Sequence, residues 1–100
     1  MYNERIIKTY PMKTNEILRE QIFETIENQI KSNNPRETNM TFKRLINSGY
    51  THYEAKQLIG QCVAVELFNI FKYKKPFDEV RYIRNLKKLP EEPFEQAIDQ

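Results

Sequence analysis

Glycine is scarce in this sequence, whose 100 residues contain only Gly49 and Gly60. A loop that cradles phosphate needs several closely spaced glycines, so that backbone N–H groups can approach the anion. Two isolated glycines exclude such a loop. The sequence also shows no Ser/His/Asp or Cys/His arrangement for nucleophilic catalysis. An enzyme is therefore the least favoured class of function.

Cysteine and histidine are scarcer still, with one residue of each, Cys62 and His52. A single cysteine cannot form an internal disulfide, and a single histidine with no second ligand at helical spacing is poor support for a metal site. We therefore expect no metal and no cofactor. His52 is expected at the solvated surface. Cys62 is expected to be an inert core thiol, because a reactive thiol needs exposure and positively charged neighbours.

Long apolar runs are also missing. The longest run without a charge, residues 57–65, is far shorter than the roughly 20 residues of a membrane-spanning helix. Residues 1–11 lack the apolar stretch of a signal peptide. Together with the lone cysteine, these absences predict a cytoplasmic protein.

The composition is that of one small folded domain. Apolar residues make up 39 % of the chain and charged residues 30 %, with a mean hydropathy of -0.78. One modest core under a well-solvated surface is expected, in a single domain over residues 1–100. The net charge of +2 is too small to indicate a polyanion-binding protein from composition alone.

Helical periodicity predicts an all-α fold, a compact bundle of about four main helices around a long, central third helix. The helices are expected over residues 14–31, 35–48, 52–74 and 79–89. An N-terminal arm, residues 1–13, precedes them and is interrupted by Pro11, and an acidic tail, residues 90–100, follows. The first helix is expected to start with Thr14 as N-cap, with an apolar face made of Leu18, Ile22, Phe23, Ile26 and Ile30.

Capping signals mark both ends of the second helix. Asn34, Pro35 and Glu37 have the pattern of a capping box with proline at the first helical position. Gly49 suits the left-handed position that follows a helix, and Tyr50 is then placed to pack back on the helix that has just ended.

The third and fourth helices also carry start signals. Thr51 and Glu54 form a second capping-box pattern. For the fourth helix, Asp78 is the expected N-cap and Phe77 is placed to pack on Tyr82. The predicted buried face of this last helix consists of Val80, Ile83, Leu86 and Leu89.

The second half of the third helix carries the clearest functional signal. Its apolar residues spread onto the side that is polar in the first half; they are Ala64, Leu67, Phe68 and Phe71. A helix that is apolar all round must be covered all round, by other segments or by a second protein. The favoured function is a non-enzymatic protein-interaction module that binds a protein partner, or itself as a homodimer, through Leu67, Phe68 and Phe71.

Glu66 lies within the apolar stripe of the same helix, close to Asn69 on the same face. A buried carboxylate is costly unless it is paired or hydrogen-bonded. One interpretation is a site residue, since carboxylates in such environments gather at active sites, and this makes an enzyme the third candidate function. The favoured interpretation is structural, either a bond to a tyrosine or arginine of a neighbouring helix or an edge position where the apolar stripe rotates.

Basic residues gather between positions 72 and 88 and suggest nucleic-acid binding as the second candidate function. They are Lys72, Lys74, Lys75, Arg81, Arg84 and Lys88, of which the last three fall on one face of the fourth helix, opposite its apolar face. Such a patch could contact phosphates. The interpretation that we favour is a solvated face, neutralised in part by Glu91, Glu92 and Glu95.

Residues 42–62 also have the outline of a helix-turn-helix, with the start of the third helix as recognition helix. This interpretation is disfavoured because the same turn residues suit any helical hairpin and the third helix is unusually long. In the same region, Ser48-Gly49-Tyr50 and the later Ala55 loosely resemble the Gly-Phe/Tyr loop of ubiquitin-associated domains, without the rest of that three-helix pattern.

Five short motifs span about two thirds of the chain. They are Asn-Pro-x-Glu-Thr at 34–38, Arg-Leu-x-x-x-Gly-Tyr at 44–50, Glu-Ala-x-x-Leu-Ile at 54–59, Lys-Pro-Phe-Asp-Glu at 75–79 and Leu-Pro-Glu at 89–91. In these motifs the sequence resembles a family of small bacterial all-helical proteins with no assigned activity. The resemblance implies a helical fold in a bacterial cytosolic protein, and it implies no catalytic residues.

Overall fold

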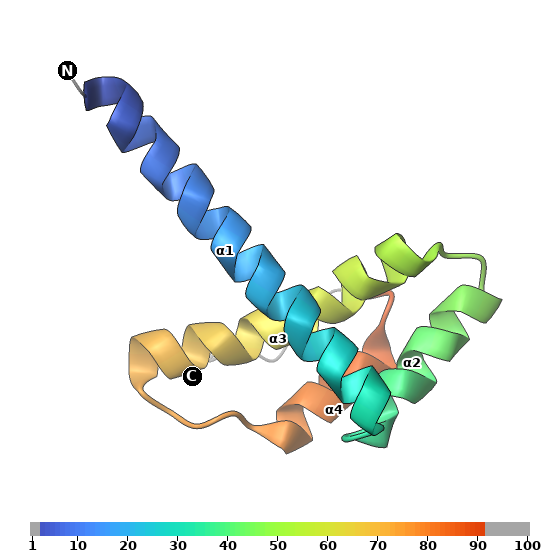
Figure 1. Cartoon of the computed structure of the whole chain (residues 1–100). Coiled ribbons are helices and arrows are strands. Elements are labelled where there is room, and N and C mark those ends of the chain that lie inside the picture. The colour runs from blue at the N-terminus through green and yellow to red at the C-terminus, as the bar shows by residue number, and fades with distance from the viewer. Residues whose placement is uncertain (1–2, 92–100) are drawn as a thin grey trace.

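A computed structural model describes residues 3–91 of the chain and the side chains of residues 16–91, and these residues form four helices (Figure 1). They are α1 (Asn3–Ser32), α2 (Arg36–Asn47), α3 (His52–Tyr73) and α4 (Glu79–Lys88). No strand occurs within residues 3–91, and the predicted all-α bundle is confirmed. None of the helices in this part of the chain is both long enough and apolar enough to cross a membrane.

Helix α3 is the centre of the bundle, as predicted, because it packs against each of the other three helices. The core combines residues of all four helices, and α3 supplies the largest share. The fully or almost fully buried apolar side chains of the core are Ile26, Leu45, Ala55, Ile59, Cys62, Val63, Tyr82, Leu86 and Leu89. Burial of each large side chain of this kind stabilises the fold by about 1.5–3 kcal/mol.

The predicted N-terminal arm is wrong for the residues described, because α1 begins at Asn3 rather than at Thr14. Pro11 lies inside the helix. A proline removes one backbone hydrogen bond, but the helix continues where the flanking sequence favours it, and residues 3–13 contain no glycine and several good helix formers. The helix formed by these residues projects from the body of the molecule (Figure 1).

The predicted capping box at the start of α2 is also wrong. Asn33 adopts a left-handed conformation (φ 55°), and the Asn34 N–H donates to the Gln29 carbonyl at 3.1 Å. This pairing is the C-terminal motif that closes α1. Asn34 is thereby held by the preceding helix, and Pro35 occupies the N-cap position of α2 with no side-chain hydrogen bond to the cap.

The turn between α2 and α3 forms as predicted. Gly49 has a left-handed φ of 106°, and the Tyr50 N–H donates to the Leu45 carbonyl at 3.1 Å. Both halves of the second capping box are present, because the Glu54 N–H donates to Thr51 Oγ1 at 3.0 Å and the Thr51 N–H donates to Glu54 Oε1 at 2.9 Å. The short local signals are sufficient to set this turn.

Helix α4 starts as predicted but is rotated relative to its predicted buried face. The Asp78 side chain accepts from the Arg81 N–H at 3.1 Å, and the Phe77 and Tyr82 rings meet edge to face at 5.2 Å between centroids. Tyr82 is fully buried, whereas Val80, expected in the core, is 65 % exposed. The apolar set that faces the bundle is Tyr82, Leu86 and Leu89, which share one side of a helix at spacings of four and three residues.

Two further hydrogen bonds tie α4 to α2. The Arg44 guanidinium, on α2, donates to the carbonyls of Leu89 at 2.8 Å and Leu86 at 3.0 Å, so it satisfies carbonyl groups at the end of α4.

The predicted acidic tail, with Glu92, Phe94, Glu95 and Ile98, lies outside the described residues apart from its first two positions.

Candidate functional site

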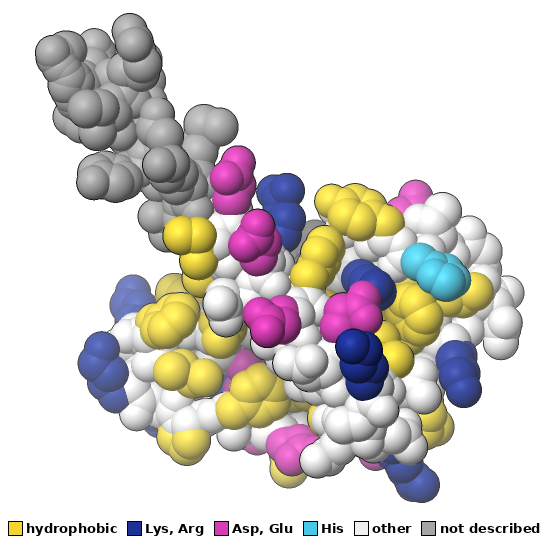
Figure 2. Space-filling model, in the orientation of Figure 1, with side chains coloured by type: hydrophobic (Ala, Val, Ile, Leu, Met, Phe, Trp, Pro, Cys, Tyr) yellow, Lys and Arg dark blue, Asp and Glu magenta, His cyan; other side chains and the backbone are white. Residues whose placement is uncertain are grey.

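The second half of α3 leaves aromatic side chains at the surface. Phe68 is 41 % exposed and Phe71 is 59 % exposed, while Leu67 is half-buried against the core. We call Leu67, Phe68 and Phe71 the α3 face. Figure 2 shows hydrophobic side chains gathered at the lower left, over this half of the helix. The apolar residues that the sequence singles out are therefore exposed or half-buried at the surface of the structure.

The α3 face stays uncovered because of where α1 crosses α3. A Cβ atom added at Gly60 would lie 3.1 Å from Ile22 Cγ2, so the two helices approach each other closely at this residue. Beyond the crossing, α1 diverges from α3 toward its own N-terminus (Figure 1). Gly60 thus fixes the point of contact, and the helix that could have covered Phe68 and Phe71 leaves the body instead.

Lysines border the α3 face at the end of the helix. The Lys72 ammonium lies 5.5 Å from the centre of the Phe68 ring and 5.8 Å from that of Tyr73, which are cation–π distances. Lys74 Nζ donates to the Phe71 carbonyl at 3.0 Å. Lys72, Lys74 and Lys75 are all exposed, so the apolar surface has a positively charged edge.

A charged helix borders the α3 face on its other side. Exposed residues of α1 include Glu16, Ile17, Glu20 and Glu24, with Ile17 at 58 % exposure. In Figure 2 acidic side chains run along α1, with Lys and Arg side chains to their right, and hydrophobic side chains lie between them and the Lys and Arg side chains at the left edge. The visible surface thus changes from acidic through apolar to basic.

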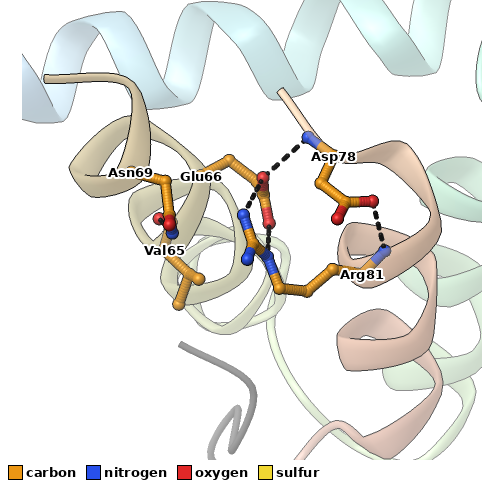
Figure 3. Close-up of polar contacts among 5 residues, drawn as sticks. All are labelled: Val65, Glu66, Asn69, Asp78 and Arg81. Atoms are coloured by element: carbon orange, nitrogen blue, oxygen red, sulfur yellow. Dashed lines mark hydrogen bonds and ion pairs between the residues drawn. The ribbon is translucent and has the colours of Figure 1, made fainter. Parts of the chain in front are cut away.

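Glu66 is fully buried and forms a two-point ion pair with Arg81 of α4 (Figure 3). Arg81 Nε lies 2.7 Å from Glu66 Oε2, and Arg81 Nη2 lies 2.9 Å from Oε1. The Asp78 N–H also donates to Oε1, at 2.9 Å. These contacts join the carboxylate of α3 to the start of α4, and they support the structural interpretation of Glu66.

Asn69 is buried one turn after Glu66. Its Nδ2 donates to the Val65 carbonyl at 2.8 Å, and its Oδ1 has no hydrogen-bond partner within the described part of the chain. In Figure 3 the Asn69 amide turns back along α3 toward Val65, while the Glu66 carboxylate faces Arg81. The two residues therefore do not form a joint polar site.

The predicted basic face on α4 needs correction. Arg81 turns inward and pairs with Glu66 instead of facing solvent beside Arg84 and Lys88. The side chain of Arg81 is 15 % exposed. The other predicted phosphate contacts are divided between the end of α3 and the outer side of α4, where Arg84 is exposed and Lys88 half-buried.

Cys62 and His52 lie where the sequence predicts. Cys62 is buried, and burial, with a smaller effect of nearby Glu66, raises the pKa of its thiol to about 12. The thiol stays protonated at neutral pH and is a poor nucleophile. His52 is exposed, with its ring edge to face with Phe42 at 5.3 Å. Within the described residues, no three His, Cys, Asp or Glu side chains are placed to hold a metal ion.

Two features of the structure escape sequence reasoning. One is a buried polar contact of Gln29 (α1), Thr38 (α2) and Tyr82 (α4): the Tyr82 hydroxyl donates to Gln29 Oε1 at 2.7 Å and lies 3.1 Å from Thr38 Oγ1. Thr38 Oγ1 also donates to Gln29 Oε1, at 2.7 Å. In the sequence, Gln29 is a polar residue within the apolar face of α1, which indicates a buried polar contact. The sequence does not indicate which residues it contacts.

The second is a hollow of about 610 Å³ between α1 and the first half of α3. Its apolar lining includes Leu18, Ile22, Phe23, Tyr50 and Leu58, and Arg19, Glu54, Gln57 and Gln61 contribute polar groups. Glu66 does not line this hollow, nor a smaller one formed by the chain between α3 and α4. No sequence signal marks it, because it results from the angle at which two helices cross.

Comparisons with protein-family models, curated proteins and solved structures find no significant match to this chain. The resemblance to small bacterial helical proteins therefore stays a prediction.

Proposed function

We propose that this chain is a small, non-enzymatic module that binds a protein partner through the α3 face. The observation that carries the proposal is the exposure of Phe68 and Phe71 next to half-buried Leu67, on a helix whose other sides are packed. Contiguous apolar surface on a small domain marks interaction sites more often than isolated apolar residues do.

The energetics favour a partner that covers both rings. Removing a phenylalanine side chain from water contributes about 1.5–3 kcal/mol, so the uncovered parts of Phe68 and Phe71 together offer about 1–3 kcal/mol. Aromatic residues that become buried at the centre of an interface supply much of its affinity. The adjacent lysines add polarity at the rim, where interfaces usually carry charge.

The alternative functions have less support in the geometry. An enzyme built on Glu66 would need the carboxylate to reach a substrate, but Glu66 is enclosed by Arg81 and the Asp78 backbone. A nucleic-acid surface would need a continuous run of outward cations, and Arg81 is withdrawn from that run. A cytoplasmic setting stays part of the proposal, because Cys62 is the only cysteine in the sequence and cannot form an internal disulfide.

The test is capture of partners by the purified full chain, compared with the double variant Phe68→Ser/Phe71→Ser. Met40→Ser is the matched control, because Met40 is 58 % exposed on α2, away from the α3 face. We expect a captured protein to be identified, to bind again when purified, and to lose at least about tenfold in affinity for the double variant alone. Equal capture by all three chains would contradict the proposal.

A further inference from the structure

The charges around the α3 face are arranged with opposite signs on its two sides. Glu16, Glu20 and Glu24 are exposed along α1, and Lys72, Lys74 and Lys75 are exposed at the end of α3. Figure 2 shows hydrophobic side chains between these acidic and basic groups. A surface that runs from acidic through apolar to basic is complementary to a copy of itself turned by half a rotation.

The shape of the same surface fits this arrangement. Helix α1 passes in front of α3 at the Gly60 crossing and then diverges from its second half (Figure 1). The result is a ridge, formed by α1, beside a lower shelf, formed by the second half of α3. A ridge beside a shelf can interlock with a second, identical ridge and shelf across a two-fold axis.

We propose that the partner of the α3 face is a second copy of this chain, with α1 of each copy lying on the second half of α3 of the other. This inference rests on the proposed function, of which it names the partner. Exposed Ile17 would then lie against Phe68 and Phe71 of the opposite copy. Glu16 and Glu20 would face Lys72 and Lys75 of the opposite copy, and the symmetry makes each contact twice.

The mixture of charges is what selects a second copy over other occupants. A phosphate-bearing partner would meet the lysines but would be repelled by Glu16, Glu20 and Glu24 on the neighbouring ridge. A purely apolar segment would leave the charged groups on both sides without a counterpart. A second copy satisfies the acidic side, the apolar centre and the basic side at once.

The experiment is sedimentation equilibrium of the full chain and of two charge-reversed variants, Glu16→Lys/Glu20→Lys and Lys72→Glu/Lys75→Glu. All four positions are exposed, so thermal unfolding of the monomer, measured at a concentration too low for dimers, should change little. The wild-type chain should associate to twice its mass of 12.1 kDa as its concentration rises. Each variant alone should dimerise at least about tenfold more weakly, because attraction is replaced by repulsion at every contact.

Mixing the two variants is the decisive step. In the mixed dimer each lysine of one chain again faces a glutamate of the other, so the mixture should regain wild-type affinity, and a merely structural effect of the substitutions would not be rescued. Added salt should weaken the wild-type dimer severalfold, which tests the charge contacts without any substitution.

A wild-type chain that is monomeric at every concentration, a mixture that does not regain affinity, or a dimer indifferent to both salt and charge reversal would overturn the inference. The two proposals fail separately. A monomeric chain that still captures another protein through Phe68 and Phe71 would leave the proposed function intact and exclude only the second copy.

Discussion

The Glu66 carboxylate on α3 and the Arg81 guanidinium on α4 meet through two hydrogen bonds, of 2.7 Å and 2.9 Å. The pair explains how a carboxylate can lie in the apolar stripe of the central helix. It also holds α4, and the segment that leads to α4, on a packed side of α3. The α3 face, by contrast, is not covered. Glu66 thus supports the fold, whereas Phe68 and Phe71 are exposed, as the proposed contact with a protein partner requires.

Glu66→Gln should destabilise the fold by about 3 kcal/mol, because it leaves the largely buried Arg81 charge without its counter-ion. The amide keeps an acceptor for the Asp78 N–H, so the loss should come mainly from the ion pair. Glu91→Gln, which removes an exposed carboxylate outside the proposed interface, is the control. Urea unfolding of both variants measures the effect, and an unchanged midpoint for Glu66→Gln would show that the pair is dispensable.

Tyr82→Phe should cost about 1–2 kcal/mol, since it removes the buried hydroxyl that reaches both Gln29 and Thr38. Thr38 and Gln29 keep their own hydrogen bond, which limits the loss. Tyr53→Phe, at a half-exposed ring, should change stability very little. A double-mutant cycle with Thr38→Val measures the coupling, and strictly additive effects would mean that the three side chains act independently.

Gly60→Leu should destabilise by about 1–3 kcal/mol or separate α1 from α3, because even a Cβ at this position meets Ile22 at 3.1 Å. Gln61→Leu is the control, since it places the same leucine side chain at an exposed position of the same helix. Thermal unfolding compares the two variants. Equal stability for both would contradict a close crossing at Gly60.

Stability should fall as the pH rises above 9, because of Cys62. Its thiol keeps the proton to a pKa of about 12 in the folded chain, whereas the ordinary pKa is 9.0. Above pH 9 the unfolded chain binds fewer protons than the folded chain, so this group favours unfolding by up to about 1.4 kcal/mol per pH unit until the folded pKa is reached. Urea unfolding across this range should give a flatter profile for Cys62→Ala, and an identical slope in the two chains would remove Cys62 as the cause.

Local signals in the sequence predict the helices well where the signal and its partner lie within a few residues. The Thr51–Glu54 capping box, the left-handed Gly49 and the Phe77–Tyr82 contact all form. Each depends on backbone geometry that neighbouring residues alone determine. The other capping-box pattern, at the start of α2, fails at Asn34 because the end of α1 already uses that residue.

Features that depend on how helices meet could not be predicted in this way. Periodicity placed both Val80 and Arg81 on α4 but did not fix its rotation, which follows from the bonds of Arg81 to Glu66 and of Tyr82 to Gln29. The apolar surplus of α3 predicts the exposure of Phe68 and Phe71. The cause of that exposure, the crossing of α1 at Gly60, cannot be predicted in this way, since a crossing angle has no sequence signature.

Photo-crosslinking in the native host tests the central claim, that the α3 face binds protein, most directly. A photoreactive phenylalanine derivative at position 71 replaces an exposed ring with one of similar shape, and the same group at Met40 provides an equally exposed control on α2. We predict a discrete adduct from position 71, with a second copy of the chain or with another protein, and none from position 40. Adducts from both positions alike, or from neither, would contradict the claim.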